Sequence, residues 1–146
     1  MEIFRQKIQV RWSDLDPNGH VRHSVYYDYG AQIRIAYLQQ LGFDIAWMSR
    51  NGLGPVLFRE EAKFHRELNS GDELVVDLQL SGLSEDHRKW SMRHHIMRGE
   101  DICAVLELDG AWLDLKTRRI TIPPQEMIEK FEAVQRTDDF RVLRSK

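Results

Sequence analysis

Residues 11–42 read RWSDLDPNGHVRHSVYYDYGAQIRIAYLQQLG and join a strand-like segment to a long helix-like one. From Tyr26 onward, apolar side chains recur three or four positions apart, which predicts a helix with a broad apolar stripe. Ser24 suits the N-cap of this helix, and Gly42 suits the position just beyond its end. Because so wide a stripe must be covered, we expect the helix of residues 24–41 to pack against a sheet.

Alternating polar and apolar residues predict that sheet. Ile8, Val10 and Trp12 alternate before the helix, and four more strands follow from residue 55 onward, separated by short polar turns. Strands joined by short turns form antiparallel sheets. The residues expected on the inner faces are Val56, Phe58, Ala62, Phe64 and Leu68, then Leu74, Val76, Leu78 and Leu80, then Trp90, Met92, His94 and Ile96, then Ile102, Ala104, Leu106 and Leu108.

The whole chain is expected to form one α+β domain over residues 1–146, an antiparallel sheet wrapped around one long helix. A chain of 146 residues is long enough to bury a single core. A short helix is expected over residues 43–52 and an amphipathic one over residues 123–134. A polar, loose tail is expected from about residue 136.

Composition narrows the class of protein. A net charge of −2 gives no basic field that would favour nucleic acid as a partner. The single cysteine, Cys103, excludes an internal disulfide and a cysteine-based zinc site. The longest run without charge, Ile35 to Phe43, is too short for a membrane span, and the N-terminus lacks a signal-peptide core. We therefore expect a cytoplasmic protein that does not bind membranes.

A polar cluster precedes the helix and has two interpretations. Asp-Pro-Asn-Gly is the chemistry of a type I turn, and Asp14 could serve only to cap a turn or to face solvent. The same stretch also has the groups of a reaction centre. Asp16 could act as base or nucleophile, Asn18 could orient a water or an ester oxygen, and His20 and His23 could transfer protons.

The helix that follows offers a site for an anion. Its first backbone N–H groups are unpaired, and its dipole favours negative charge. Backbone N–H groups near His23 and Ser24 could therefore hold the oxyanion of an acyl-transfer reaction. The sequence itself leaves a structural turn and a reaction centre as open alternatives.

The segment DPNGHVRHSVYY, followed by a long helix, resembles the hotdog-fold thioesterases, in particular the 4-hydroxybenzoyl-CoA thioesterase group with its YbgC-like members. The Asp-x-x-Gly element of that group matches at Asp16, and a histidine of its YbgC-like members matches at His23. The Asp-x-Asn-x-His-Val element of acyl-ACP thioesterases matches at Asn18 and His20. A weaker resemblance extends over nearly the whole chain.

Two departures from the acyl-ACP enzymes favour an Asp-based mechanism. Arg22 and His23 replace an asparagine pair, and Cys103 lies in a strand, so no cysteine matches their catalytic one. The resemblance implies a hotdog fold and hydrolysis of acyl thioesters, with acyl-CoA favoured and acyl-ACP as the alternative, and it implies no metal or cofactor. It also implies a homodimer or homotetramer with its site between subunits. Whether Asp16 acts as nucleophile or general base stays open, as does the acyl group.

The remaining candidates are substrate-binding residues. The resemblance places Tyr26 beside the substrate and Arg88 with Lys89 near the CoA phosphates, although a solvated hairpin explains the basic pair equally well. Glu60 falls on an apolar strand face, where it is either a pocket group or an edge or partner-bound residue. His94 is expected to be a satisfied core histidine. A non-catalytic protein that binds acyl thioesters is the alternative function on the same scaffold.

Overall fold

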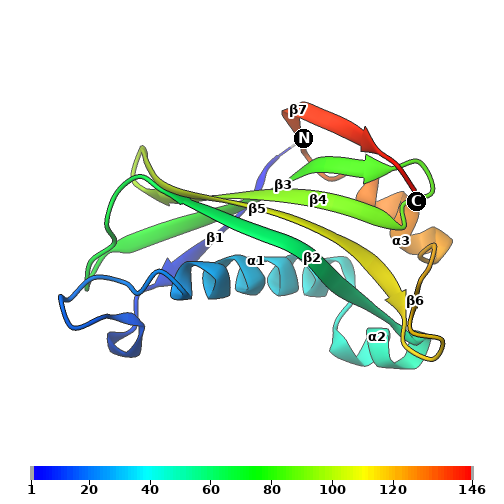
Figure 1. Cartoon of the computed structure of the whole chain (residues 1–146), viewed down its shortest axis with the longest axis horizontal. Coiled ribbons are helices and arrows are strands. Elements are labelled where there is room, and N and C mark those ends of the chain that lie inside the picture. The colour runs from blue at the N-terminus through cyan, green and yellow to red at the C-terminus, as the bar shows by residue number, and fades with distance from the viewer. Residues whose placement is uncertain (1, 146) are drawn as a thin grey trace.

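The computed structural model describes residues 2–145, and in it a curved sheet covers one long helix, α1 (Val25–Leu41) (Figure 1). The strands are β1 (Phe4–Gln9), β2 (Leu53–Phe64), β3 (Glu73–Ser84), β4 (Lys89–Arg98), β5 (Asp101–Asp114), β6 (Arg119–Ile120) and β7 (Arg136–Leu143). The other helices are a 3-10 turn (Trp12–Asp14), α2 (Ile45–Asn51) and α3 (Gln125–Phe131). The order of the long elements is the one that the sequence predicts.

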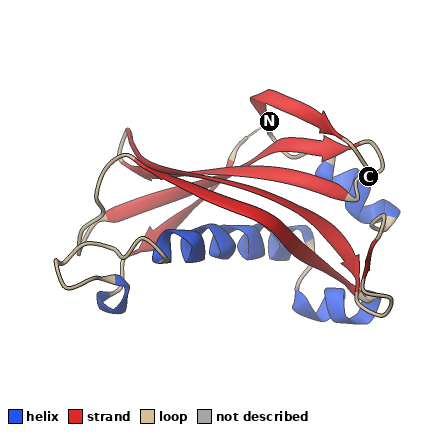
Figure 2. Cartoon of the chain, viewed as in Figure 1, coloured by secondary structure: helices blue, strands red, loops and turns tan. Residues whose placement is uncertain are grey.

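The sheet runs in the order β1-β3-β4-β5-β2, with antiparallel neighbours along this path. β2 lies at one edge, and no described strand pairs with its outer side. At the other edge, β1 and β7 share strand β3, β1 over Glu73–Leu78 and β7 beyond it. Figure 2 shows α1 running beneath the sheet, while α2 and α3 both lie near the end of α1 that is far from the β1–α1 loop.

The central strands bury the predicted faces because their alternation is uninterrupted. The expected inner residues of β3 and β4 are all buried, and so are the last three of β5, Ala104, Leu106 and Leu108. Ile102 is an exception, since a register shift opposite Ile96 and Met97 turns its side chain outward. His94 is fully buried, as expected of a core histidine.

β2 departs from the predicted alternation. Its pairing with β5 shifts between Leu57 and Arg59, so the intervening Phe58 turns outward and is 57% exposed. Phe64 is also exposed, whereas Ala62 packs against the core. The expectation of one continuous apolar face from Val56 to Phe64 is therefore wrong.

The long helix begins and ends where the sequence predicts. Gly42 takes the left-handed conformation, φ 95°, and its N–H closes the last turn on Leu38 and Gln39. Ser24 occupies the N-cap position, but its side chain makes no capping hydrogen bond, so that part of the prediction is wrong. At Gly30 the helix approaches the sheet so closely that a Cβ atom would lie 2.7 Å from Leu106 Cδ1.

The C-terminal segment is not the loose tail that its polarity suggested. Residues Arg136–Leu143 form β7, which runs parallel to the end of β3. Thr137 is buried there, and Arg93 binds Asp139 through two hydrogen bonds of 3.0 and 2.9 Å. These contacts fix the segment to the sheet.

Candidate active site

The predicted cluster converges on one cleft at the start of α1. The cleft, of about 370 Å³, is lined by five of the predicted residues, Asp16, Asn18, His20, His23 and Tyr26. Its other wall comes from the end of β2 and the residues just after it, Phe64, His65, Arg66 and Glu67. A local turn and a distant strand end therefore build the site together.

Asp16 holds the turn and still keeps a free oxygen. Its Oδ1 accepts the backbone N–H groups of Asn18 and His20, at 2.9 and 3.1 Å. The N–H of Gly19 donates to the Asp16 carbonyl at 3.0 Å, which closes a β-turn over Asp-Pro-Asn-Gly, as the sequence predicts. No described residue donates to Oδ2 of Asp16, so one carboxylate oxygen is available to a substrate or a water. The turn and the reaction centre are compatible.

The two histidines differ in their surroundings. His20 Nε2 lies 3.1 Å from Glu67 Oε2, so its ring is oriented by a carboxylate from the opposite wall. His23 is exposed at the entry of α1, and no hydrogen bond to a described residue fixes its ring. His20 is therefore the better positioned of the two, whereas His23 is free to move.

The start of α1 provides unpaired donors. The N–H of Val25 donates to the carbonyl of Arg22 at 3.0 Å, but no described residue accepts from the N–H groups of His23 or Ser24. Such groups at a helix start attract negative charge. Next to them the buried Tyr26 packs edge-on against Phe64, with ring centroids 4.8 Å apart. The donors that the sequence predicts for an oxyanion are thus unpaired, and one of the two residues, His23, lines the cleft.

Asp14 is buried, so the expectation of a solvated residue is wrong, but it does cap a turn: its carboxylate accepts the backbone N–H of Arg11, the N-cap residue of the 3-10 turn Trp12–Asp14. It is 1% exposed and accepts hydrogen bonds from the Arg11 backbone and guanidinium and from the Tyr29 hydroxyl, at 2.8–3.1 Å. Burial alone would raise its pKa, but the hydrogen bonds from Arg11 and Tyr29 hold it below the usual value. Asp14 thus anchors the loop that carries Asp16 onto α1.

Arg88 and Lys89 lie outside the cleft. They belong to the β3–β4 hairpin, which Figure 1 shows near α3, at the opposite end of α1 from the Asp16 loop. Arg88 Nε lies 2.8 Å from Asp86 Oδ2, so part of its charge is already neutralised. Within one chain, therefore, neither residue of this basic pair lines the cleft that contains Asp16.

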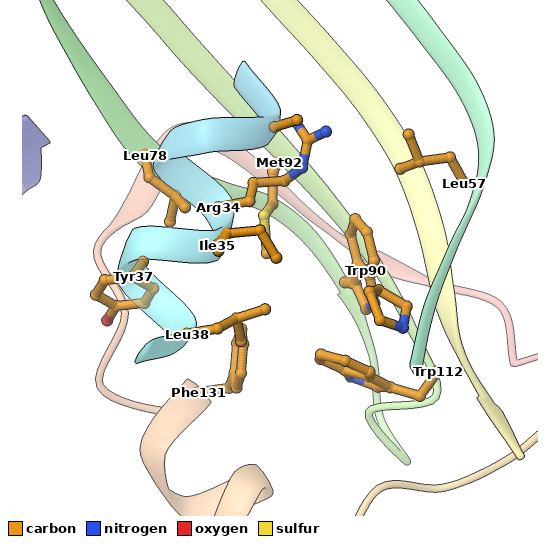
Figure 3. A pocket seen from close by; sticks show the side chains of 12 residues that line it. Arg34, Ile35, Tyr37, Leu38, Leu57, Leu78, Trp90, Met92, Trp112 and Phe131 are labelled. Carbon is orange, nitrogen blue, oxygen red and sulfur yellow. The ribbon is translucent and has the colours of Figure 1, made fainter. Parts of the chain in front are cut away.

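A second hollow, an apolar cavity of about 200 Å³, lies between α1 and the sheet. Figure 3 shows Leu38 and Phe131 on one side of it and Trp90 and Trp112 on the other, with Arg34 at its opposite end. Glu60 lines neither the cleft nor this cavity, and its Oε2 lies 3.6 Å from Arg34 Nη2. The structure therefore separates Glu60 from Asp16 and joins it to a residue that the sequence analysis overlooked.

The ring of His94 connects Arg34 to strand β3 through two hydrogen bonds. Its Nδ1 lies 2.9 Å from the Asp77 carbonyl, which can only accept, so Nδ1 carries the proton and Nε2 accepts from Arg34 Nη1 at 3.0 Å. Burial, followed by the charge of Arg34, lowers the pKa of His94 from 6.5 to about 3. The Asp77 carboxylate and the neighbouring His95 are the other titratable groups that act on this ring.

The buried His94 should make the protein acid-sensitive. Between pH 6.5 and 3 the unfolded chain binds a proton at this histidine and the native one does not, so stability falls as pH falls. We expect a loss of about 2 kcal/mol between pH 7 and pH 5 in urea unfolding at one protein concentration. His94→Gln should lose most of this difference. An equal pH dependence in both proteins would contradict the assignment.

The described residues contain no group of three or more His, Cys, Asp or Glu side chains placed to hold a metal ion. The described helices also include none with the length and apolar character needed to cross a membrane.

A family model described as "Thioesterase-like superfamily" matches residues 10–131. The chain belongs to this superfamily. It is 31% identical over 140 residues to the chloroplastic acyl-acyl carrier protein thioesterase ATL3 of Arabidopsis thaliana, covering 94% of this chain and 72% of that protein. The resemblance inferred from Asp16 to Tyr27 is therefore confirmed, and thioester hydrolysis is the reaction class that the membership supports.

Comparison with solved structures shows that this chain has the hotdog fold of the thioesterases. A Staphylococcus aureus protein in complex with CoA superposes with a TM-score of 0.83 at 16% identity, covering 93% of this chain and 87% of the other. A 1,4-dihydroxy-2-naphthoyl-CoA thioesterase from Synechocystis superposes with a TM-score of 0.79 at 17% identity, covering 90% and 97%. At these identities the likeness concerns the fold alone.

Proposed function

We propose that the protein hydrolyses acyl thioesters, most readily acyl-CoA, at the cleft beside Asp16. The observation that carries this proposal is that Asp16, a carboxylate with one free oxygen, lines the same cleft as His23, whose backbone N–H is unpaired at the start of α1. Water adds to the acyl carbon, the C–S bond breaks, and a carboxylic acid and a thiol are released. Acyl-ACP is the alternative carrier, because a relative is an acyl-ACP thioesterase.

In this mechanism Asp16 either attacks the carbonyl carbon or removes a proton from the attacking water. Both routes put negative charge on the carbonyl oxygen, which the N–H groups of His23 and Ser24 would stabilise. One such donor contributes about 3–4 kcal/mol to the barrier reduction. Asn18 would orient the water or the ester oxygen. His20, held by Glu67, or the freer His23 would return a proton to the departing thiolate.

A direct assay tests the proposal. Free thiol released from a panel of aliphatic and aromatic acyl-CoAs, and from acyl-ACP, should rise with enzyme concentration for at least one of these substrates. Binding of acyl-CoA without thiol release would instead identify a non-catalytic thioester-binding protein.

The complete site is proposed to form between two copies. β2 is an open sheet edge, and Phe58 and Leu57 on it are 57% and 40% exposed, which is unfavourable in an isolated chain. A two-fold axis makes two β2 strands pair antiparallel. The Phe64 end of one strand then lies beside the Leu53 end of the other. In such a dimer, the apolar cavity and the Arg88–Lys89 hairpin of one copy would lie near the Asp16 cleft of the other copy.

We therefore expect a homodimer or homotetramer. Sedimentation velocity at micromolar concentration should give at least twice the mass of the chain, and Phe58→Lys should shift the protein toward monomer because a charge would be buried at the paired edges. Val142→Lys is a matched control, since Val142 is 67% exposed on β7, which pairs with β3 on the other side of the sheet from β2. A stable wild-type monomer at this concentration would contradict the shared site.

A further inference from the structure

Trp12 is 89% exposed, more than any other large apolar side chain that the structure describes. Leaving an indole in water is unfavourable, because its burial removes a large apolar surface from solvent. Tryptophan is also among the residues that most often anchor a protein–protein contact. Trp12 is therefore a candidate anchor for a partner.

The turn that carries Trp12 is held from both sides. On one side, the buried Asp14 accepts hydrogen bonds from the N–H and the guanidinium of Arg11. On the other, Arg22 donates its N–H to the Asp14 carbonyl at 2.8 Å and a guanidinium N–H to the Ser13 carbonyl at 2.6 Å. The indole is thus presented to solvent on a fixed turn, so little freedom is lost when a partner covers it.

Asp16 lies in the same loop, four residues after Trp12. Further along this loop, the N–H of Val21 donates to the carbonyl of Leu68 at 2.8 Å. That bond attaches the loop just beyond the Phe64 end of β2. A contact that fixes Trp12 would therefore also fix the position of Asp16.

The other end of β2 has an apolar surface of its own. α2 directly precedes β2, so this helix lies at the Leu53 end of the strand. Ile45 is 71% exposed at the start of α2. Leu115, whose N–H donates to the Gly52 carbonyl at 2.8 Å, is 40% exposed beside the end of the same helix. Exposed apolar side chains thus lie at both ends of α2.

Two-fold symmetry brings the Trp12 loop and α2 together. When two β2 strands pair antiparallel, the Phe64 end of one lies beside the Leu53 end of the other. Figure 1 shows the 3-10 turn that contains Trp12 and α2 at opposite ends of α1, on the same side of the sheet. An axis perpendicular to the sheet keeps both on that side. The Trp12 loop of each copy then faces α2 of the second copy.

The size of β2 also calls for such a contact. Specific interfaces bury about 800 Å² on each partner, from about 20–30 residues a side. β2 has 12 residues, so a stable dimer needs residues from the segments beside it. The Trp12 loop and α2 are attached to the two ends of this strand and carry exposed apolar side chains.

We propose that, in the dimer through β2 on which the proposed shared site rests, Trp12 of one copy packs on the exposed face of α2 of the second copy, beside Ile45. The contact occurs twice in each dimer. Trp12 is a positioning residue, which acts on thioester hydrolysis only through the loop that carries Asp16. The dimer thus holds each Asp16 loop in place.

Cross-linking tests the contact directly. Trp12→Cys combined with Ile45→Cys, or with Ser49→Cys one turn further along α2, should give a covalent dimer on a denaturing gel after treatment with a short bis-maleimide. Trp12→Cys/Val142→Cys is the matched control, since Val142 is 67% exposed on β7, and it should remain a monomer on the gel. The native Cys103 is fully buried and should not react.

Association and kinetics give a second readout. Trp12→Ser should raise the dissociation constant of the dimer by at least about 100-fold, because two anchors are lost and each contributes about 10-fold or more. At concentrations where both proteins are dimeric, Trp12→Ser should lower kcat for thiol release by about 10-fold with little change in KM, since the loop is less well positioned. Trp12→Phe, which keeps an aromatic ring, should restore most of both.

The outcomes separate this contact from the proposed function. A covalent dimer from either α2 pair, absent from the Val142 pair, supports the contact. A wild-type dimer in which neither α2 pair cross-links, or a Trp12→Ser protein that associates as tightly as wild type, overturns the contact and leaves thioester hydrolysis intact. A wild-type monomer overturns the shared site and the contact together. A cross-linked dimer that releases no thiol overturns the proposed function alone.

Discussion

Asp16→Asn should lower kcat for thioester hydrolysis by at least about 100-fold, the usual scale for loss of a general base. The structure makes this substitution a sharp test. Oδ1 of Asp16 accepts two backbone N–H groups, and the amide oxygen of Asn can accept both. The change therefore removes the negative charge and the free Oδ2 while keeping the turn. The melting temperature and KM should remain close to wild type, because the donors at the α1 start and the pocket are unchanged.

The control needs an aspartate with the same hydrogen-bonding task far from the cleft. Asp44 caps α2, and its Oδ1 accepts the N–H of Trp47 at 2.8 Å. Asp44→Asn also removes a negative charge while it keeps the shape of the side chain. Because Asp44 lies away from the cleft, kcat should stay unchanged. Steady-state thiol release from an acyl-CoA measures both variants. Wild-type activity in Asp16→Asn would show that Asp-Pro-Asn-Gly is only a structural turn, and it would contradict the proposed mechanism.

The architecture was predictable wherever the signal is local. The α1 stripe, Gly42 and the alternation of β3 and β4 are each determined by neighbours in sequence, and the structure confirms them. β2 was not predictable in detail, because a bulge at Phe58 inverts the alternation and depends on pairing with β5. β7 was missed because the residues of β3 with which it pairs lie 56 to 59 positions earlier in the chain.

The candidate site was likewise predictable only where its residues are close in the sequence. Asp16, Asn18, His20 and His23 lie close together in the chain, so their proximity follows from the sequence, and the cleft confirms it. Glu67 reaches His20 only because β2 passes the start of α1, which no local pattern indicates. Arg34 carried a signal that was overlooked: it follows Gly30 by four positions, so it shares the helix face that meets the sheet.

Asp14→Ala should destabilise the protein by about 3 kcal/mol or more, although this residue is only two positions from Asp16. Its carboxylate accepts from the backbone and side chain of Arg11 and from Tyr29, and it is 1% exposed. Removing it leaves the buried Tyr29 hydroxyl without an acceptor and empties space beneath the loop. A lost hydrogen bond to a charged group costs about 1.5–3 kcal/mol, and an unsatisfied buried partner adds to that. Asp14 is therefore unsuitable as a mild control for Asp16.

Urea unfolding at pH 7 and a fixed protein concentration measures the loss at Asp14. Tyr29→Phe removes only the hydrogen bond from the Tyr29 hydroxyl to Asp14, and it should lower the free energy of unfolding by about 1 kcal/mol. Combined with Asp14→Ala it should add little, because the two residues share that bond. The folded fraction of Asp14→Ala should retain measurable thioester hydrolysis, since the carboxylate of Asp16 is still present. Wild-type stability in Asp14→Ala would show that the β1–α1 loop is held by other contacts.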